Sequence, residues 1–163
     1  MNRPILSTRN LPDAGFRKLG SVLLVDDNRH VRLLVAQILE AKGYEVELEE
    51  DAMTALERIK ENRPDLILCD GLMPEMDGWS LCAEVRRCFP EDRLPFVIMT
   101  SMDKEELIGL SQQSGIDGYL IKPFRSGSLM QLIERILGAP SHGFSHGEIM
   151  IYDWESMRLA DVG

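Results

Sequence analysis

Polar side chains stand directly after short apolar runs of this sequence, at the points where buried strands would end. They are Asp26, Asp27, Asp70, Thr100 and Lys122. Carboxylates brought to one place repel one another and raise one another's pKa values, and a single lysine offsets only one of the charges. A divalent cation with oxygen ligands, magnesium or manganese, relieves that repulsion. The residue types therefore predict a metal-assisted acidic site.

Phosphoryl transfer is the chemistry that these residue types serve together. With a cation bound, Asp70 stays ionised and can attack phosphorus as a nucleophile. The cation and Lys122 would neutralise charge on the phosphoryl oxygens, and the Thr100 hydroxyl can donate a hydrogen bond to one of them. Each residue alone has a plainer explanation, since a strand-terminal Asp pair often caps a helix and Lys-Pro often forms a surface turn. The combination at one end of several strands is what favours a site.

The apolar runs themselves predict strands of a parallel sheet. Four of them, at 21–25, 66–69, 96–99 and 119–121, are almost wholly apolar, as expected of strands that are buried on both faces. Residues 44–48 instead alternate apolar residues with glutamate. That alternation predicts a strand with one face in water, suited to the edge of the sheet.

Segments with helical periodicity separate these strands. They cover 28–42, a stretch capped by Asp51, a stretch from Trp79 to about Phe89, 103–113 and 126–137. We expect Gly43 to end the first helix as its C′ residue, and the second helix to bury Met53, Leu56 and Ile59. Strand and helix alternate five times, which predicts an α/β fold with a five-stranded parallel sheet and helices on both faces. Sites in such sheets form outside the carboxyl ends of the strands, where the polar residues stand.

Composition and charge exclude several classes of protein. The chain has 163 residues, 44% of them hydrophobic, and a net charge of −9, an acidic balance that disfavours direct nucleic-acid binding. Its apolar runs are too short to span a membrane, and residues 1–20 lack the apolar core of a secretory signal. The cysteines, Cys69, Cys82 and Cys88, show no CxxC spacing. Reduced thiols and a cytoplasmic location are therefore expected.

Four motifs of the sequence resemble the receiver domain of two-component response regulators. They are residues 22–28 (Val-Leu-Leu-Val-Asp-Asp-Asn), Asp70-x-x-Met73-Pro74-x-x-Asp77-Gly78, Thr100-Ser101, and residues 119–124 (Tyr-Leu-Ile-Lys-Pro-Phe). The likeness spans about residues 20–138. It implies the flavodoxin-like strand order 2-1-3-4-5, which the chemotaxis member of the family shows.

The resemblance also implies a role for each site residue. Asp70 would be the phosphoacceptor, taking phosphate from a histidine of a sensor kinase or of a histidine phosphotransfer protein. Asp27, Asp70 and the main-chain carbonyl of Leu72 would bind magnesium directly, and Asp26 would act largely through water. Lys122 would pair with the phosphoryl group. A receiver of this kind assists its own phosphorylation and slow dephosphorylation and is not an enzyme for external substrates.

A switch is implied as well. Thr100 and Tyr119 match the pair that rearranges on phosphorylation and alters the face made by the fourth helix, fifth strand and fifth helix. The expected helix at 103–113 contains Gly109, which costs about 1 kcal/mol relative to alanine. Low local stability agrees with a switching element, and an exposed, poorly optimised helix is the alternative.

Two positions depart from the family's pattern. Leu72 and Met102 stand two residues after Asp70 and Thr100, where polar side chains are common and help to hold a hydrolytic water. Apolar side chains cannot orient water or accept its proton, so a slowly hydrolysing acyl phosphate is expected. Leu72 also disfavours an aspartyl-nucleophile phosphatase of the haloacid-dehalogenase type, which needs a carboxylate there. A pseudo-receiver would lack one or more site residues, and all are present.

The chain divides into an extension at 1–20, a receiver at 21–138, and a linker with a short tail at 139–163. His142 and His146 stand four residues apart in the linker, but the glycines around them disfavour a metal site. The tail is apolar at 149–152 and faintly similar to the start of a histidine phosphotransfer bundle. A stand-alone receiver and a fragment of a longer chain both remain open, as do the output partner and homodimerisation.

Overall fold

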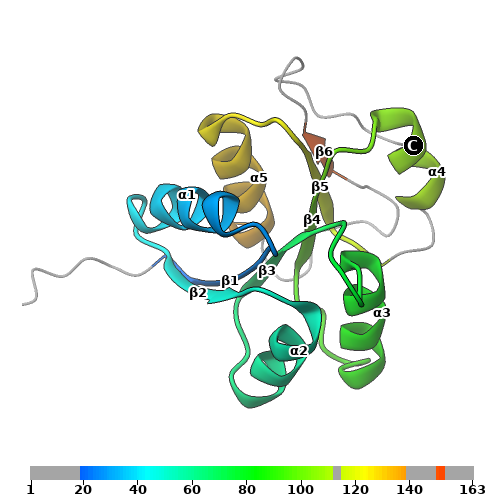
Figure 1. Ribbon diagram of the computed structural model, residues 1–163. Coiled ribbons are helices and arrows are strands. Elements are labelled where there is room, and N and C mark those ends of the chain that lie inside the picture. The colour runs from blue at the N-terminus through cyan, green and yellow to red at the C-terminus, as the bar shows by residue number, and fades with distance from the viewer. Residues whose placement is uncertain (1–18, 112–114, 139–149, 153–163) are drawn as a thin grey trace, which may run out of the picture.

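The computed structural model describes residues 19–111, 115–138 and 150–152, and its centre is one parallel sheet (Figure 1). The strands are β1 Ser21–Val25, β2 Glu45–Glu49, β3 Leu66–Asp70, β4 Phe96–Thr100, β5 Gly118–Ile121 and β6 Met150–Tyr152. Their order across the sheet is β2-β1-β3-β4-β5-β6, and every neighbouring pair is parallel. The order 2-1-3-4-5 is therefore confirmed, and a sixth strand that was not expected extends it.

Helices cover both faces of this sheet. They are α1 Arg29–Glu40, α2 Ala52–Glu61, α3 Gly78–Cys88, α4 Lys104–Ser111 and α5 Ser126–Gly138. Helices α1 and α5 lie on one face, and α2, α3 and α4 lie on the other (Figure 1). In β1 the side chains alternate between the two layers, since Val22 and Leu24 pack with α1 and α5 while Leu23 and Val25 pack with α2 and α3. Burial on both faces explains why the central strands are continuous apolar runs.

Three expectations about the helices were wrong in detail. The first helix ends at Glu40 with Ala41 as its cap, so Gly43 lies two residues beyond the cap, where it takes a φ of 101°. Met53 of α2 is 50% exposed, because alanines at 52 and 55 fill the buried face beside Leu56 and Ile59. The fourth helix starts at Lys104, since the Asp103 carboxylate caps it by accepting the Glu106 N–H at 2.9 Å.

Several expectations concern residues outside the described part of the chain. These include most of the extension at 1–20, residues 112–113 of the fourth helix, the His142 and His146 pair, and the tail after Tyr152. Within the described ranges, no helix has the length and apolar character needed to cross a membrane. Cys69, Cys82 and Cys88 form no disulfide within the described part of the chain.

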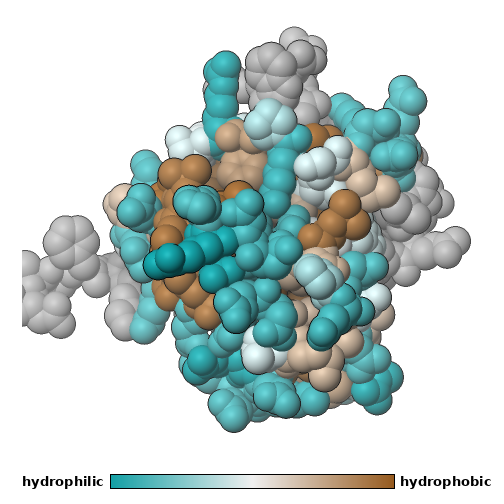
Figure 2. Space-filling model, in the orientation of Figure 1, coloured by the Kyte–Doolittle hydropathy of each residue, from teal (hydrophilic) through white to brown (hydrophobic). Residues whose placement is uncertain are grey.

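The surface is mainly hydrophilic on the face drawn in Figure 2. Apolar side chains interrupt it over α1 and near the start of α3. Large exposed apolar residues include Leu33 and Leu34 of α1 and Leu72 of the loop after β3. Leu72 is 65% exposed, and it lies two residues after the acid that ends β3.

Candidate functional site

The carboxyl ends of four neighbouring strands meet at one edge of the sheet. Asp70 is the last residue of β3, and it lies opposite Met99 of β4, whose next residue is Thr100. The backbone N–H of Lys122, just past the end of β5, donates to the Thr100 carbonyl at 2.7 Å. The parallel register thus brings together the polar residues that the sequence placed after separate strands.

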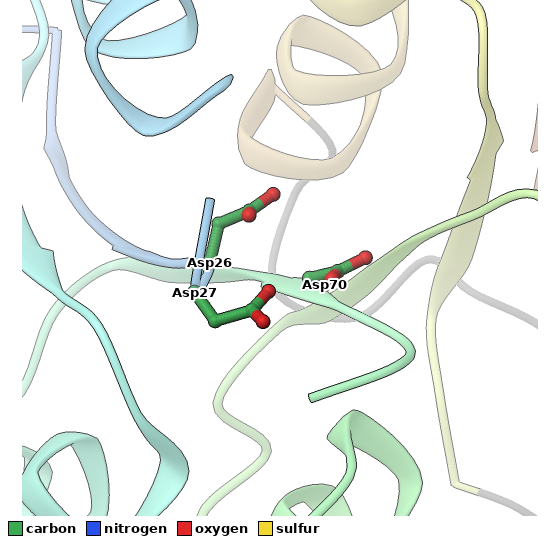
Figure 3. A group of neighbouring side chains, drawn as sticks. All are labelled: Asp26, Asp27 and Asp70. Carbon is green, nitrogen blue, oxygen red and sulfur yellow. The ribbon is translucent and has the colours of Figure 1, made fainter. Parts of the chain in front are cut away.

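Three carboxylates form the centre of this site. Oxygens of Asp26, Asp27 and Asp70 all lie within 4.8 Å of one another. Figure 3 shows Asp26 and Asp27 extending from the segment after β1 and Asp70 extending from β3 beside them. Asp26 is fully buried and Asp70 nearly so, whereas Asp27 is exposed. The acidic cluster is therefore buried on one side and open to solvent on the other.

Lys122 joins two of these carboxylates. Its Nζ donates to Asp70 Oδ1 at 2.9 Å and to Asp26 Oδ2 at 3.2 Å. The Lys122 side chain is 21% exposed, so it is mostly shielded from solvent. Among the described residues, Lys122 is the one cation paired with the three carboxylates, so the cluster keeps an excess of negative charge.

The pKa values of the pair reflect this environment. Burial raises the pKa of the Asp70 carboxyl above its ordinary value, and the charges of Asp26 and Asp27 raise it further, while Lys122 opposes the rise. Burial lowers the pKa of the Lys122 ammonium, but the hydrogen bond to Asp70 and the two nearby carboxylates outweigh burial, so its pKa is raised overall. Burial thus disfavours the ionised form of the Asp70 carboxyl, and Lys122 favours it.

The explanation that Asp26 and Asp27 merely cap the first helix does not hold. Asn28 caps α1, because its side-chain oxygen accepts the N–H groups of His30 and Val31 at 3.0 and 3.3 Å. Asp26 Oδ1 accepts the Asn28 N–H at 2.8 Å, which orients the carboxylate toward the site. The pair is thus available for binding chemistry at the strand end.

A match to known proteins decides the family. The model of the response regulator receiver domain matches residues 22–134. The chain belongs to this family. Response regulator MprA of Mycobacterium sp. (strain KMS) is 38% identical over 118 residues, which are 71% of this chain and 50% of that protein. The chain thus spans about half the length of the curated relatives it matches.

Solved structures agree with this assignment. A putative response regulator from Chloroflexus aurantiacus J-10-fl has 32% sequence identity and a TM-score of 0.69, covering 74% of this chain and 98% of that one. The chemotaxis response regulator CheY4 of Vibrio cholerae has 31% identity and a TM-score of 0.65, covering 71% and 97%. The chain therefore contains a response regulator receiver domain of two-component systems, a family of phosphoacceptor signalling modules, and it has the flavodoxin-like strand order of such neighbours.

Two glycines let the receiver close tightly around Asp70. A Cβ on Gly78 would lie 2.5 Å from the Asp70 carbonyl oxygen, and a Cβ on Gly71 would lie 2.7 Å from the Trp79 ring. The Gly78 N–H also donates to the Gly71 carbonyl at 3.0 Å. The start of α3 therefore packs directly on the backbone of Asp70. The sequence showed these glycines only as turn formers, because the close approach depends on how α3 packs.

The expected switch residues lie in neighbouring strands. Thr100 is 1% exposed, and its Oγ1 accepts the Met102 N–H at 3.1 Å. Tyr119 of β5 is fully buried in the layer of α2, α3 and α4. Met102 packs partly against the same layer. Thr100 is therefore at the site, whereas Tyr119 lies within the core behind it.

The residues present fit a magnesium ion. Asp26, Asp27 and Asp70 supply only oxygen donors, and their proximity leaves negative charge that Lys122 does not balance. Magnesium is usually bound by carboxylates and keeps several of its water ligands. Receiver domains typically bind Mg²⁺, and the exposed Asp27 gives such an ion access from solvent.

Proposed function

We propose that this receiver takes a phosphoryl group from a phosphohistidine onto Asp70. The observation that carries the proposal is the Asp70 carboxylate, held at 2.9 Å by Lys122 inside an acidic cluster. In the step, an Asp70 oxygen attacks phosphorus, and a P–O bond forms as the P–N bond to the donor imidazole breaks. The imidazole nitrogen keeps the bonding electron pair and takes a proton from solvent.

The neighbouring side chains hold the incoming group. The Lys122 ammonium, now shared between Asp70 and Asp26, would move its hydrogen bonds to phosphoryl oxygens. The Thr100 hydroxyl accepts from the Met102 N–H, which lets the same hydroxyl donate to another phosphoryl oxygen. Magnesium bound by Asp27, Asp70 and the main-chain carbonyl of Leu72, with Asp26 acting through water, would neutralise charge on the phosphoryl oxygens.

Signalling would follow from a change on the face made by α4, β5 and α5. Lys122 follows β5 directly and Thr100 ends β4, so both residues that would contact the phosphoryl group are continuous with this part of the sheet. A sensor histidine kinase or histidine phosphotransfer protein would be the donor, and another protein would read the face. We assign the receiver to residues 21–138 and its place of action to the cytoplasm.

The phosphatase alternative remains disfavoured. An aspartyl-nucleophile phosphatase needs an acid or base two residues after the nucleophile, and that position holds the 65% exposed Leu72. Without a proton-transfer group there, the acyl phosphate should persist instead of being turned over.

Chemical phosphorylation tests the proposal. The protein is incubated with acetyl phosphate or phosphoramidate and magnesium, and intact mass is measured before and after alkali. We expect a stoichiometric, alkali-labile adduct that Asp70→Asn abolishes. Asp92→Asn is the control, because Asp92 is an exposed acid that pairs with Arg63. Absence of an adduct would leave a pseudo-receiver, and rapid turnover of aryl phosphates would indicate a phosphatase.

Hydrogen exchange tests the switch separately. Exchange across residues 104–111 is compared with and without beryllium fluoride, which mimics the phosphoryl group. We expect α4 to change its protection, because it is short and Leu107 is its one fully buried side chain among those described. Identical protection would remove α4 from the switch and leave the phosphoacceptor proposal intact.

A further inference from the structure

The strand β6 adds to the sheet at the side opposite β2. Residues 150–152 run parallel to β5, with Met150 opposite Gly118, Ile151 opposite Tyr119 and Tyr152 opposite Leu120. Figure 1 shows β6 beyond β5 at the end of the sheet, and β6 also contacts α5. The segment reaches this place after residues 139–149, so the pairing is a long-range contact and not a hairpin.

The two edges of the five-stranded sheet differ in how they avoid further pairing. The edge strand β2 has the sequence Glu-Val-Glu-Leu-Glu, and charged side chains on an edge discourage another strand from pairing there. The strand β5 has the sequence Gly-Tyr-Leu-Ile, with no charge and no proline. Without β6, the outer side of β5 would be the edge of an apolar strand, a ready template for strand addition.

The strand β6 pairs with this edge of β5, although it is very short. It has three residues, which is at the short end for strands in proteins, and Glu148 and Asp153 flank it in the sequence. A short strand with flanking charges is itself a poor template for further pairing. The same shortness means that few backbone hydrogen bonds hold β6, so a competing extended segment can replace it.

We propose that the β5 edge is a strand-binding site whose resident ligand is this chain's own segment 150–152. The site accepts an extended apolar segment in the parallel direction, through main-chain hydrogen bonds. Because residues 139–149 tether the segment to α5, its high effective concentration keeps the site filled. A partner that reads β5 must then displace residues 150–152. This inference does not depend on the chemistry of Asp70.

A peptide in trans tests the site in the full, unphosphorylated chain. The variant carries Met150→Pro with Ile151→Pro, because N–H groups of adjacent strand residues face opposite sides, so the pair removes at least one N–H donor to β5 whichever of the two residues faces it. The control carries Ser145→Pro with His146→Pro, the same pair outside β6. The probe is a fluorescent peptide with the sequence of residues 147–154. We expect the peptide to bind the variant at least about tenfold more tightly than the wild type or the control.

Each outcome decides the question. Equal binding to all three proteins, or binding to none, overturns the proposal. Binding to the variant that restores slow hydrogen exchange at residues 118–120 supports it. Hydrogen exchange of the wild type is a second test, which stays valid if the proline pair unfolds the domain. Fast exchange at both 118–120 and 150–152 overturns the proposal. A wild-type dimer that exchanges β6 between copies, detected by sedimentation, also overturns it, because the segment would then bind in trans.

Discussion

The two ends of the sheet differ in whether acidic or cationic side chains are in excess. At the amino end, before β5, the Asp117 carboxylate is fully matched: Oδ2 accepts from Arg86 Nη2 at 2.9 Å and from the Phe96 N–H at 2.8 Å, and Oδ1 pairs with Arg93 at 3.3 Å. At the carboxyl end, after β5, three carboxylates lie together, and among the described residues Lys122 is the one cation paired with any of them. Acids outnumber cations at one end, and cations outnumber acids at the other.

This difference in charge balance suits the amino end to a structural role and the carboxyl end to binding. A buried acid surrounded by donors holds elements together and has little capacity left for a ligand. A cluster with excess negative charge is costly unless a cation joins it, so it is suited to bind one. We expect mutations at the amino end to change the free energy of unfolding, and mutations at the carboxyl end to change the response to metal, phosphate and pH.

The largest expected effect is at the amino end. Arg86→Ala removes the Asp117 pair and the donors to the carbonyls of Leu94 and Gly115, at 2.7 and 3.0 Å. Breaking such a buried pair should lower the free energy of unfolding by about 3 kcal/mol. The matched control is Arg87→Ala, since Arg87 is 72% exposed and pairs only with Glu84 among described residues. Its cost should stay under about 0.5 kcal/mol. The free energy of unfolding is measured in urea, and an equal decrease for Arg86→Ala and Arg87→Ala would contradict this prediction.

Magnesium should stabilise the carboxyl end by the next largest amount. At one hundred times its dissociation constant, a ligand of the folded state adds about 2.7 kcal/mol. We expect Asp27→Asn to lose most of that gain and Asp92→Asn to keep it. Thermal unfolding is followed against magnesium chloride, with potassium chloride at matched ionic strength as the reference. The same gain in Asp27→Asn would place the cation elsewhere.

The lifetime of the acyl phosphate should respond to the apolar neighbours of the acidic cluster. Leu72→Asn together with Met102→Glu gives the site groups that can orient water and accept its proton. We expect hydrolysis to become faster by about tenfold or more. Loss of the radioactive phosphoryl group in a pulse-chase is the measurement, and Leu33→Asn on exposed α1 is the control. An unchanged lifetime would show that these two positions do not limit hydrolysis.

The smallest expected effect is a pH dependence. Burial raises the pKa of Asp70 in the folded chain above its ordinary value. At a pH between the ordinary and the raised pKa, the folded state therefore binds more protons than the unfolded state. The free energy of unfolding of the metal-free protein should therefore fall across this window because of Asp70. Asp70→Asn should remove that fall, while Asp26 still holds Lys122 at 3.2 Å. If the free energies of unfolding of variant and wild type depend on pH in the same way, folding does not raise the pKa of Asp70.

Much of this molecule follows from local pattern. The runs at 21–25, 66–69 and 96–99 are almost wholly apolar, and the structure makes them strands buried on both faces as expected. Asp51 caps α2 through the Thr54 N–H, as its place before a helical pattern indicated. The family motifs predicted the strand order 2-1-3-4-5, and the sheet confirms it.

Other features could not be predicted, because they depend on contacts between distant residues. Asp117 and Arg86 are 31 residues apart, and no local pattern in the sequence pairs them. The apolar run at 149–152 was visible, but nothing local in the sequence says that it pairs with β5. Met53 was expected to be buried, but the small alanines of α2 let that helix turn a different face to the sheet.

The sequence by itself determined which residues end the strands, and therefore which side chains stand at the reactive edge. Residue type and periodicity act over a few neighbours, so Asp26, Asp70 and Lys122 were identifiable one at a time. Only the tertiary structure decided that they meet: Lys122 bonds Asp70 across 52 residues and Asp26 across 96. Strand order and register set those contacts, and the packing of both helical layers sets the order.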